Sequence, residues 1–270
     1  MAINLLKTRR NIPMSVHESR KAFKKCRTAL RAGKLGFKGY KDENLFFRDL
    51  GRLLSQLRDY QAVQDTLLHL YQTKDHPARR ASCKIISKPL LVKKAQLERN
   101  LIRNDKLFEK IVNLLQFKLE EINNWELELA SFELLAKGLK KVYKKGQKIR
   151  HKACVTGKLE DFHEWRKQAK YFYYQLEFIS PLWPNYIGVL NSEFNQLTDK
   201  IGEEHDLVIL EELMDTERIS IKNTTRMNAF RECIDYHKQA ARKESLGLGS
   251  RCYIFPAKCV KNIVQKLGAL

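Results

Sequence analysis

The sequence predicts an all-α protein built from two similar antiparallel helical-bundle halves that are related by pseudo-twofold symmetry. Three observations lead to this expectation: apolar residues recur at helical spacing, turn-forming residues are scarce, and two blocks of sequence occur twice. The 270 residues include only 12 glycines and 6 prolines, too few for the turns of a many-stranded sandwich or barrel. No segment has the alternating pattern of a strand, and no apolar run is long enough to cross a membrane.

Apolar residues spaced three or four apart indicate the helices in order, as in residues 42–72, where Leu50, Leu53, Leu54 and Leu57 follow one another. The expected helices cover about 14–33, 42–72, 78–102, 104–122, 130–153, 159–180, 185–216, 224–245 and 256–267. Breaks are expected at Gly33, Gly36 and Gly39, at Pro77, at Gly157, at Pro181 and Pro184, and at Gly247 and Gly249.

The repeat appears in the blocks VHESRKAFKK, which begins at Val16, and FHEWRKQAKY, which begins at Phe162. His17 and His163 are separated by the same offset as Arg20 and Arg166. The pairs Arg58-Asp59 and His205-Asp206 stand at nearly that offset. We therefore expect halves of about 1–130 and 131–270. Because no Gly/Ser/Pro-rich linker separates them, they should form one domain spanning 1–270.

The positive charge falls in stripes. Lysine and arginine number 51 against 31 acidic residues, a formal net charge of +20. At helical spacing one face collects His17, Arg20, Lys24, Arg27 and Arg31, another Lys137, Lys141, Lys144, Lys148 and Lys152, and a third His163, Arg166, Lys167 and Lys170. These stripes contain almost no acid, and like charges at this spacing destabilise a helix. We therefore expect an anion to bind these stripes and to supply the missing charge.

Several blocks resemble the CHAD domain family, whose name refers to its histidines and α-helical content. They are the repeated block at 17–27, HEWRKQAK at 163–170, GEEHDL at 202–207, GLKKVYKKGQK at 138–148 and YYQLEFISPLWP at 173–184. The resemblance implies a non-catalytic protein that binds inorganic polyphosphate through basic residues of a central groove. We expect no cofactor and no metal, and a cytoplasmic location in association with polyphosphate granules.

The residues that we expect to bind polyphosphate lie in these blocks and stripes. They are His17, Arg20, Lys21, Lys24, Lys25, Arg27, Arg31, Arg58, Lys137, Lys141, Lys144, Lys145, Lys148, His163, Arg166, Lys167, Lys170 and His205. We expect Asp59, Asp206 and Tyr173 to orient their neighbours, the two carboxylates also keeping nearby cations charged. Lys24 and Lys25 stand where members of the family usually have Arg, as does Tyr173 in the second half.

Three alternatives stay open. The strong positive charge would suit nucleic acid, although no helix-turn-helix, RNP or zinc-finger signature is present and Trp125, Trp165 and Trp183 have the spacing of core residues. A scaffold for an acidic protein partner is the second. The third is a metal-dependent phosphohydrolase of polyphosphate, which the His205-Asp206 pair resembles. Against it, Arg58 stands at the equivalent of His205 in the first half, and Arg is not a metal ligand. Six cysteines without a C-x-x-C pair indicate reduced thiols.

Overall fold

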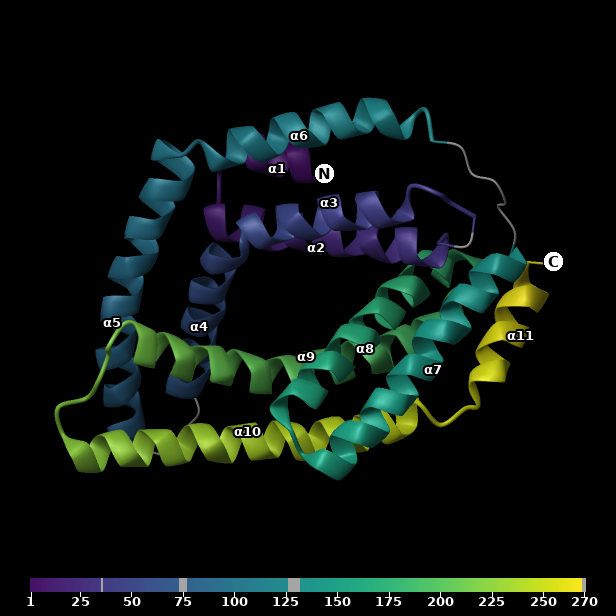
Figure 1. The fold of residues 1–270 in the computed structure, drawn as a ribbon. Coiled ribbons are helices and arrows are strands. Elements are labelled where there is room, and N and C mark those ends of the chain that lie inside the picture. The colour runs from purple at the N-terminus through teal and green to yellow at the C-terminus, as the bar shows by residue number, and fades with distance from the viewer. Residues whose placement is uncertain (35, 73–76, 126–131, 269–270) are drawn as a thin grey trace. The chain divides into compact units, whose positions relative to one another are not determined.

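The computed structural model describes residues 1–34, 36–72, 77–125 and 132–268, and every regular element in these ranges is helical (Figure 1). In chain order the elements are α1 (Ala2–Thr8), α2 (Ile12–Ala32), α3 (Tyr40–Leu53), α4 (Ser55–Gln72), α5 (Pro77–Glu98), the π-helical η1 (Arg99–Asn104), α6 (Leu107–Ile122), α7 (Phe132–Thr156), α8 (Leu159–Ile179), the 3₁₀-helical η2 (Ser180–Leu182), α9 (Pro184–Thr216), α10 (Thr224–Cys252) and α11 (Ala257–Leu267). The predicted all-α class is confirmed. None of these helices combines the length and the apolar character needed to cross a membrane.

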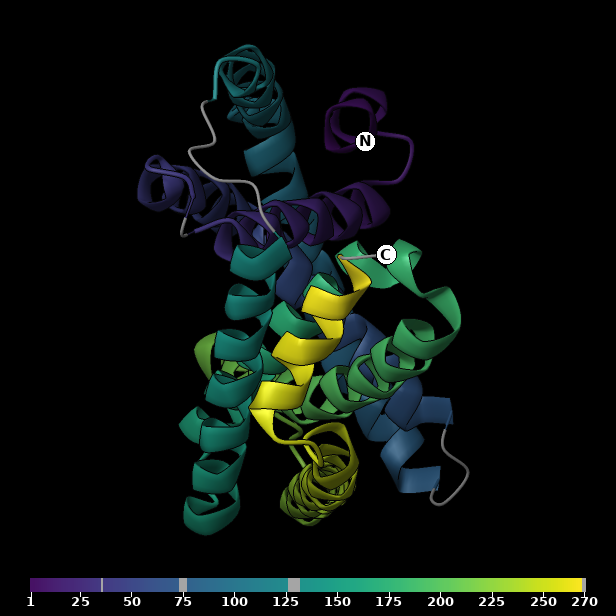
Figure 2. The same ribbon diagram turned by 90° about the vertical axis from the view of Figure 1, so that its right-hand side faces the viewer.

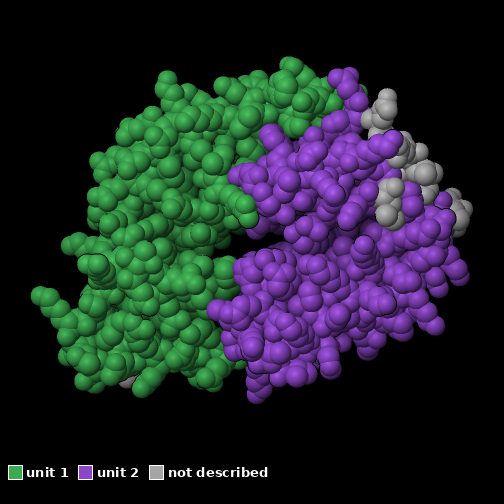
Figure 3. Space-filling model, in the orientation of Figure 1, with its two compact units in different colours: residues 1–22, 50–123, 203–240 green, residues 23–49, 124–202, 241–270 purple. Residues whose placement is uncertain are grey.

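The chain folds into two compact units, which Figure 3 colours separately. Unit 1 comprises residues 1–22, 50–123 and 203–240, and unit 2 comprises residues 23–49, 124–202 and 241–270. Helices α2, α3, α9 and α10 contribute residues to both, so each unit takes segments from both halves of the sequence. The pseudo-twofold relation of the halves stays a prediction, and their expected boundary at 130 and 131 lies outside the described residues.

The core of unit 1 forms where α4 and α5 pack against each other and against parts of α9 and α10. Each helix contributes apolar side chains three or four residues apart, because that spacing places them on one face. The core members include Val63, Leu67 and Leu70 of α4, Ile86 and Leu90 of α5, Leu207 and Leu210 of α9, and Phe230 and Ile234 of α10.

The core of unit 2 is aromatic. Figure 2 shows α11 lying along α7, and α8 packs against the same helix. The ring centroid of Tyr143 lies 5.0 Å from that of Phe172 and 5.1 Å from that of Tyr253. Its hydroxyl donates to the carbonyl oxygens of Cys252 and Phe255, at 3.2 and 3.1 Å. These hydrogen bonds tie α7 to the end of α10, so the buried phenol keeps its polar atom satisfied.

Two predictions of where helices break are wrong. Residues 42–72 form two helices instead of one, because the chain breaks at the fully buried Leu54 although the apolar spacing continues through it. The expected break at Gly247 and Gly249 is wrong, since α10 runs on to Cys252. A Cβ on Gly249 would lie 2.4 Å from Cζ2 of Trp165, so this glycine makes room for the indole ring and does not end the helix.

The tryptophans divide between core and surface. Trp165 is fully buried, as predicted, and Trp125 is half-buried with its ring 4.7 Å from that of Phe37. The expectation that Trp183 belongs to the core is wrong: it is 48% exposed and stacks on Tyr186 near the start of α9, at 4.8 Å. Proline at 184 starts the helix there, and the spacing of apolar residues near a helix end does not report burial.

All six cysteines are free thiols.

Candidate functional site

In unit 1, the first repeated block places Arg20 on α2 against the C-terminal end of α3. The half-buried guanidinium donates through Nη1 to the carbonyl oxygen of Gly51. Burial lowers the pKa of Arg20, the carboxylate of Asp59 opposes this shift, and the charge of Arg58 adds to it. The fold therefore brings Arg20, Arg58 and Asp59 within electrostatic reach, with Asp59 favouring the charged form of Arg20.

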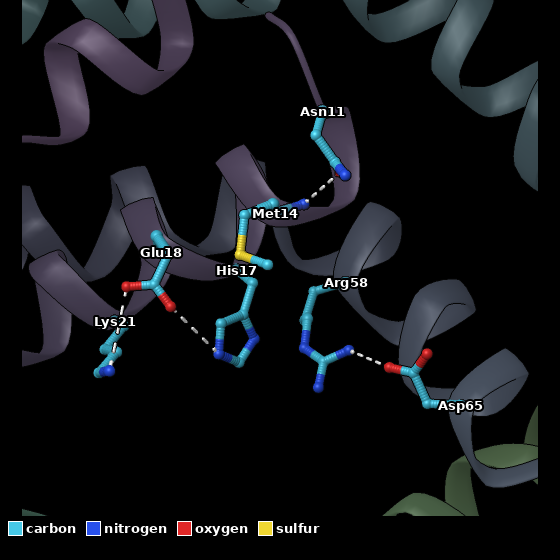
Figure 4. A network of polar contacts seen from close by, with 7 residues as sticks. All are labelled: Asn11, Met14, His17, Glu18, Lys21, Arg58 and Asp65. Atoms are coloured by element: carbon cyan, nitrogen blue, oxygen red, sulfur yellow. Dashed lines mark hydrogen bonds and ion pairs between the residues drawn. The ribbon is translucent and has the colours of Figure 1, made fainter.

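His17, Lys21 and Arg58 have acidic neighbours: Glu18 within the repeated block for the first two, and Asp65 outside it for Arg58 (Figure 4). His17 is exposed, and its Nε2 lies 3.7 Å from Oε1 of Glu18. The second oxygen of Glu18 lies 3.9 Å from Nζ of Lys21. From α4, Arg58 Nη1 contacts Oδ2 of Asp65 at 3.4 Å. The cations of unit 1 are thus partly neutralised by carboxylates from their own and neighbouring turns.

The GEEHDL block lies on α9. Its His205 and Asp206 are half-buried, and the preceding Glu204 is almost fully buried, all three in unit 1. Among the residues that the structure describes, no group of three or more His, Cys, Asp or Glu side chains is arranged to hold a metal ion. Ligand contact by His205 and an orienting role for Asp206 stay predictions.

Gly202, the first residue of that block, belongs to unit 2 and has a spatial role there. A Cβ at this position would lie 3.0 Å from Nη2 of Arg166. Glycine therefore lets the half-buried guanidinium of the second repeated block lie directly against α9. Two motifs that are distant in sequence meet at this contact, which the sequence pattern alone does not reveal.

The C-terminal part of α2 lies in unit 2 and contacts α8 through its cations. Lys25 Nζ lies 2.5 Å from Oε1 of Glu177. Arg27 donates through Nε to Oδ1 of Asn44 at 3.2 Å and through Nη2 to the hydroxyl oxygen of Tyr171 at 3.5 Å. Arg31 lies over the ring of the same tyrosine, 4.2 Å from its centroid. Lys24, also predicted to bind the ligand, is half-buried here.

Helix α7 presents an exposed face of lysines. Leu139, Tyr143 and Gly146 are buried on the opposite face. Near its two ends, Lys137 pairs with Glu133 at 2.8 Å and Lys152 with Asp161 at 2.6 Å. The exposed ammonium groups between these pairs belong to Lys141, Lys144, Lys145 and Lys148. Of these, Lys141, Lys144 and Lys148 form no ion pair with any residue in the described ranges.

On α8, the second repeated block has its own acidic neighbours. Lys167 pairs with Glu164 at 2.6 Å, and Lys170 lies 3.3 Å from Oδ1 of Asp199. The ring centroid of Tyr173 lies 5.2 Å from Nζ of Lys170. This contact places Tyr173 beside a cation, and its orienting role stays a prediction.

The imidazole of His163 is half-buried among charges of the same helix. Burial lowers its pKa, the charges of Lys167 and Arg166 lower it further, and Glu164 opposes them. In the ligand-free protein these surroundings therefore favour the neutral form of His163.

Sequence reasoning missed three residues around Arg27. They are Asn44 and Tyr171, which accept its hydrogen bonds, and Arg48, whose charge lowers its pKa. Asn44 and Arg48 lie outside the repeated blocks, and Tyr171 stands in the second block at a position without positive charge. A signal was nevertheless present in the position of Tyr171, one residue after Lys170 in the second block.

Fold and side chains together define an all-helical protein with clustered cations, some on an exposed helix face and some half-buried against aromatic and amide groups. The family model of the CHAD domain matches residues 4–215, more than half of the chain, and the protein therefore belongs to the CHAD domain family. A search of curated proteins found no match.

Proposed function

We propose that this protein binds inorganic polyphosphate through its cationic side chains and does not hydrolyse it. The observation that carries the proposal is the run of Lys141, Lys144 and Lys148 on α7, three exposed ammonium groups on one helix face without an ion pair in the described part of the chain. Like charges at this spacing repel each other, and a bound polyanion would remove that cost.

The chemistry of polyphosphate fits this surface. It is a flexible polyanion without bases, so dense cationic groups rather than base-reading side chains are needed to hold it. Lysines supply point charges, and arginines supply planar donor forks for phosphate oxygens. Cations mounted on helices are already ordered, which lowers the entropy lost on binding.

Membership of the CHAD domain family supports this ligand, because the resemblance of the repeated blocks implies polyphosphate binding without catalysis. We extend the proposal to a cytoplasmic location in association with polyphosphate granules.

Nucleic acid is the second candidate. The exposed, stacked rings of Trp183 and Tyr186 favour it, since such rings can stack on bases.

Competition binding at fixed salt tests the proposal, with labelled long-chain polyphosphate displaced by DNA, RNA or an acidic polypeptide. We expect unlabelled polyphosphate to compete best. The Lys141→Ala/Lys144→Ala/Lys148→Ala variant should bind polyphosphate at least roughly ten-fold more weakly and show a shallower dependence of affinity on salt, because fewer counterions are released.

The matched control is Lys110→Ala/Lys222→Ala/Lys243→Ala, which removes the same charge from three exposed lysines outside the predicted site. It should retain most of the affinity. Equal losses in both variants would mean that bulk charge holds the ligand. Tighter binding of DNA or RNA than of polyphosphate would favour the second candidate.

A further inference from the structure

Tyr171 contacts two arginines of the candidate site and is not among the residues predicted to bind polyphosphate. It lies on α8 in unit 2, and both arginines come from the part of α2 in the same unit. Its ring lies under the guanidinium of Arg31, and its hydroxyl accepts a hydrogen bond from Arg27. One phenol side chain thus touches two neighbouring cations in two different ways.

The charges around this tyrosine are not balanced. Neither Arg27 nor Arg31 forms an ion pair with a carboxylate in the described ranges. Burial lowers the pKa of Arg27, Tyr171 opposes this shift, and the charges of Arg31 and Arg48 add to it. Arg48 is itself paired with Asp49, at 2.8 and 3.1 Å. The two remaining guanidinium groups therefore repel each other in a partly buried setting.

Their donors are only partly used. Nε of Arg31 is buried and has no hydrogen-bond partner among the described residues. Arg27 uses Nε for Asn44 and Nη2 for Tyr171. A guanidinium has five N–H donors, so both side chains keep donors that a phosphate oxygen could accept.

We propose that Tyr171 is a positioning residue for the polyphosphate site. Its ring fixes Arg31 by stacking, and its hydroxyl fixes Arg27. The two cations are thereby held side by side for one stretch of the polyanion. This inference rests on the proposed function. The conformational entropy of the two arginine side chains is then lost when the protein folds and not when the ligand binds. This strengthens binding without any contact between Tyr171 and the ligand.

The test compares Tyr171→Phe and Tyr171→Ala with the wild type. Phenylalanine keeps the stack on Arg31 and loses the acceptor for Arg27, whereas alanine loses both. Isothermal titration with long-chain polyphosphate should show affinity reduced roughly three-fold for phenylalanine and roughly ten-fold for alanine. The matched control is Tyr71→Ala, because Arg80 and Lys84 lie over that ring at 5.6 and 5.4 Å outside the predicted site. It should bind as the wild type does.

A second measurement does not depend on the ligand. Side-chain ¹⁵N relaxation at Nε of Arg27 and Arg31 in the ligand-free protein should show both groups more mobile in Tyr171→Ala, and only Arg27 more mobile in Tyr171→Phe. A purely structural role would lower the melting temperature without this graded pattern.

The two proposals can fail separately. If the wild type does not bind polyphosphate, the proposed function fails, and unchanged arginine mobility in the variants would overturn the positioning role as well. If the wild type binds and Tyr171→Ala binds equally well, the proposed function stands and the positioning role is wrong.

Discussion

His163, the histidine of the second repeated block, illustrates the physics at the scale of one residue. Burial and the charges of Lys167 and Arg166 lower its pKa, with Glu164 opposing them. The unfolded chain therefore binds a proton at this position at a higher pH than the folded protein does. Protonation favours the unfolded state, so this histidine costs stability as the pH falls through about 6.5, the ordinary value for the group.

We predict that His163→Gln reduces the loss of folding stability at low pH. Denaturant titration should give a smaller decrease in the free energy of unfolding between about pH 7 and pH 5 for the variant than for the wild type. Identical profiles for wild type and His163→Gln would show that the imidazole is not buried as described.

At the scale of one element, α10 contains two glycines whose surroundings differ. Gly247 and Gly249 both lie inside this helix. A Cβ on Gly247 would meet nothing within 4 Å, whereas one on Gly249 would lie 2.4 Å from Cζ2 and 2.6 Å from Cη2 of Trp165. Packing against the indole thus explains one glycine, and the other only weakens the helix.

These two glycines give a matched pair of variants. Gly247→Ala should stabilise the protein by about 0.5–1 kcal/mol, because alanine is the better helix former. Gly249→Ala should destabilise it by about 1–3 kcal/mol, because the new methyl group forces Trp165 to move. Thermal melts at one pH measure both. Two shifts of the same sign would contradict the packing of Trp165 against α10.

The helix α7 makes a related point about charge. Its buried face explains why the helix forms, and its exposed lysines explain nothing about folding, since they repel each other. These lysines cost stability and recur along one helix face, which supports the binding role proposed for them.

At the scale of the whole molecule, the formal net charge of +20 opposes compact folding. We predict that raising the salt concentration from about 20 mM to about 300 mM increases the melting temperature of the ligand-free protein, because salt screens this repulsion. Polyphosphate at low salt should raise it too, by mass action on the folded state, and should do so less at high salt. Differential scanning calorimetry measures both effects. A melting temperature that falls with salt would mean that attractive ion pairs dominate over the excess charge.

Sequence and structure agree best where the information is local. Apolar spacing of three and four predicts most helices, and the buried Leu139 and Tyr143 opposite the exposed Lys141 and Lys144 follow from the same spacing. The spacing misses α1, whose buried Leu6 is covered because α1 packs against α6. It also carries on through the break at Leu54, because a buried residue at a helix junction looks like any other core residue.

The sequence by itself determined the helical class, the family and which residues carry the cations, since each of these follows from residue types and their spacing. Only the tertiary structure decided which partner each cation has. Arg20 donates to the carbonyl oxygen of Gly51, Lys25 pairs with Glu177, and Tyr171 contacts both Arg27 and Arg31. Helical periodicity predicts which face of a helix a side chain is on. The packing of distant segments determines what lies opposite that face, and this in turn determines the charge, burial and order of the side chain.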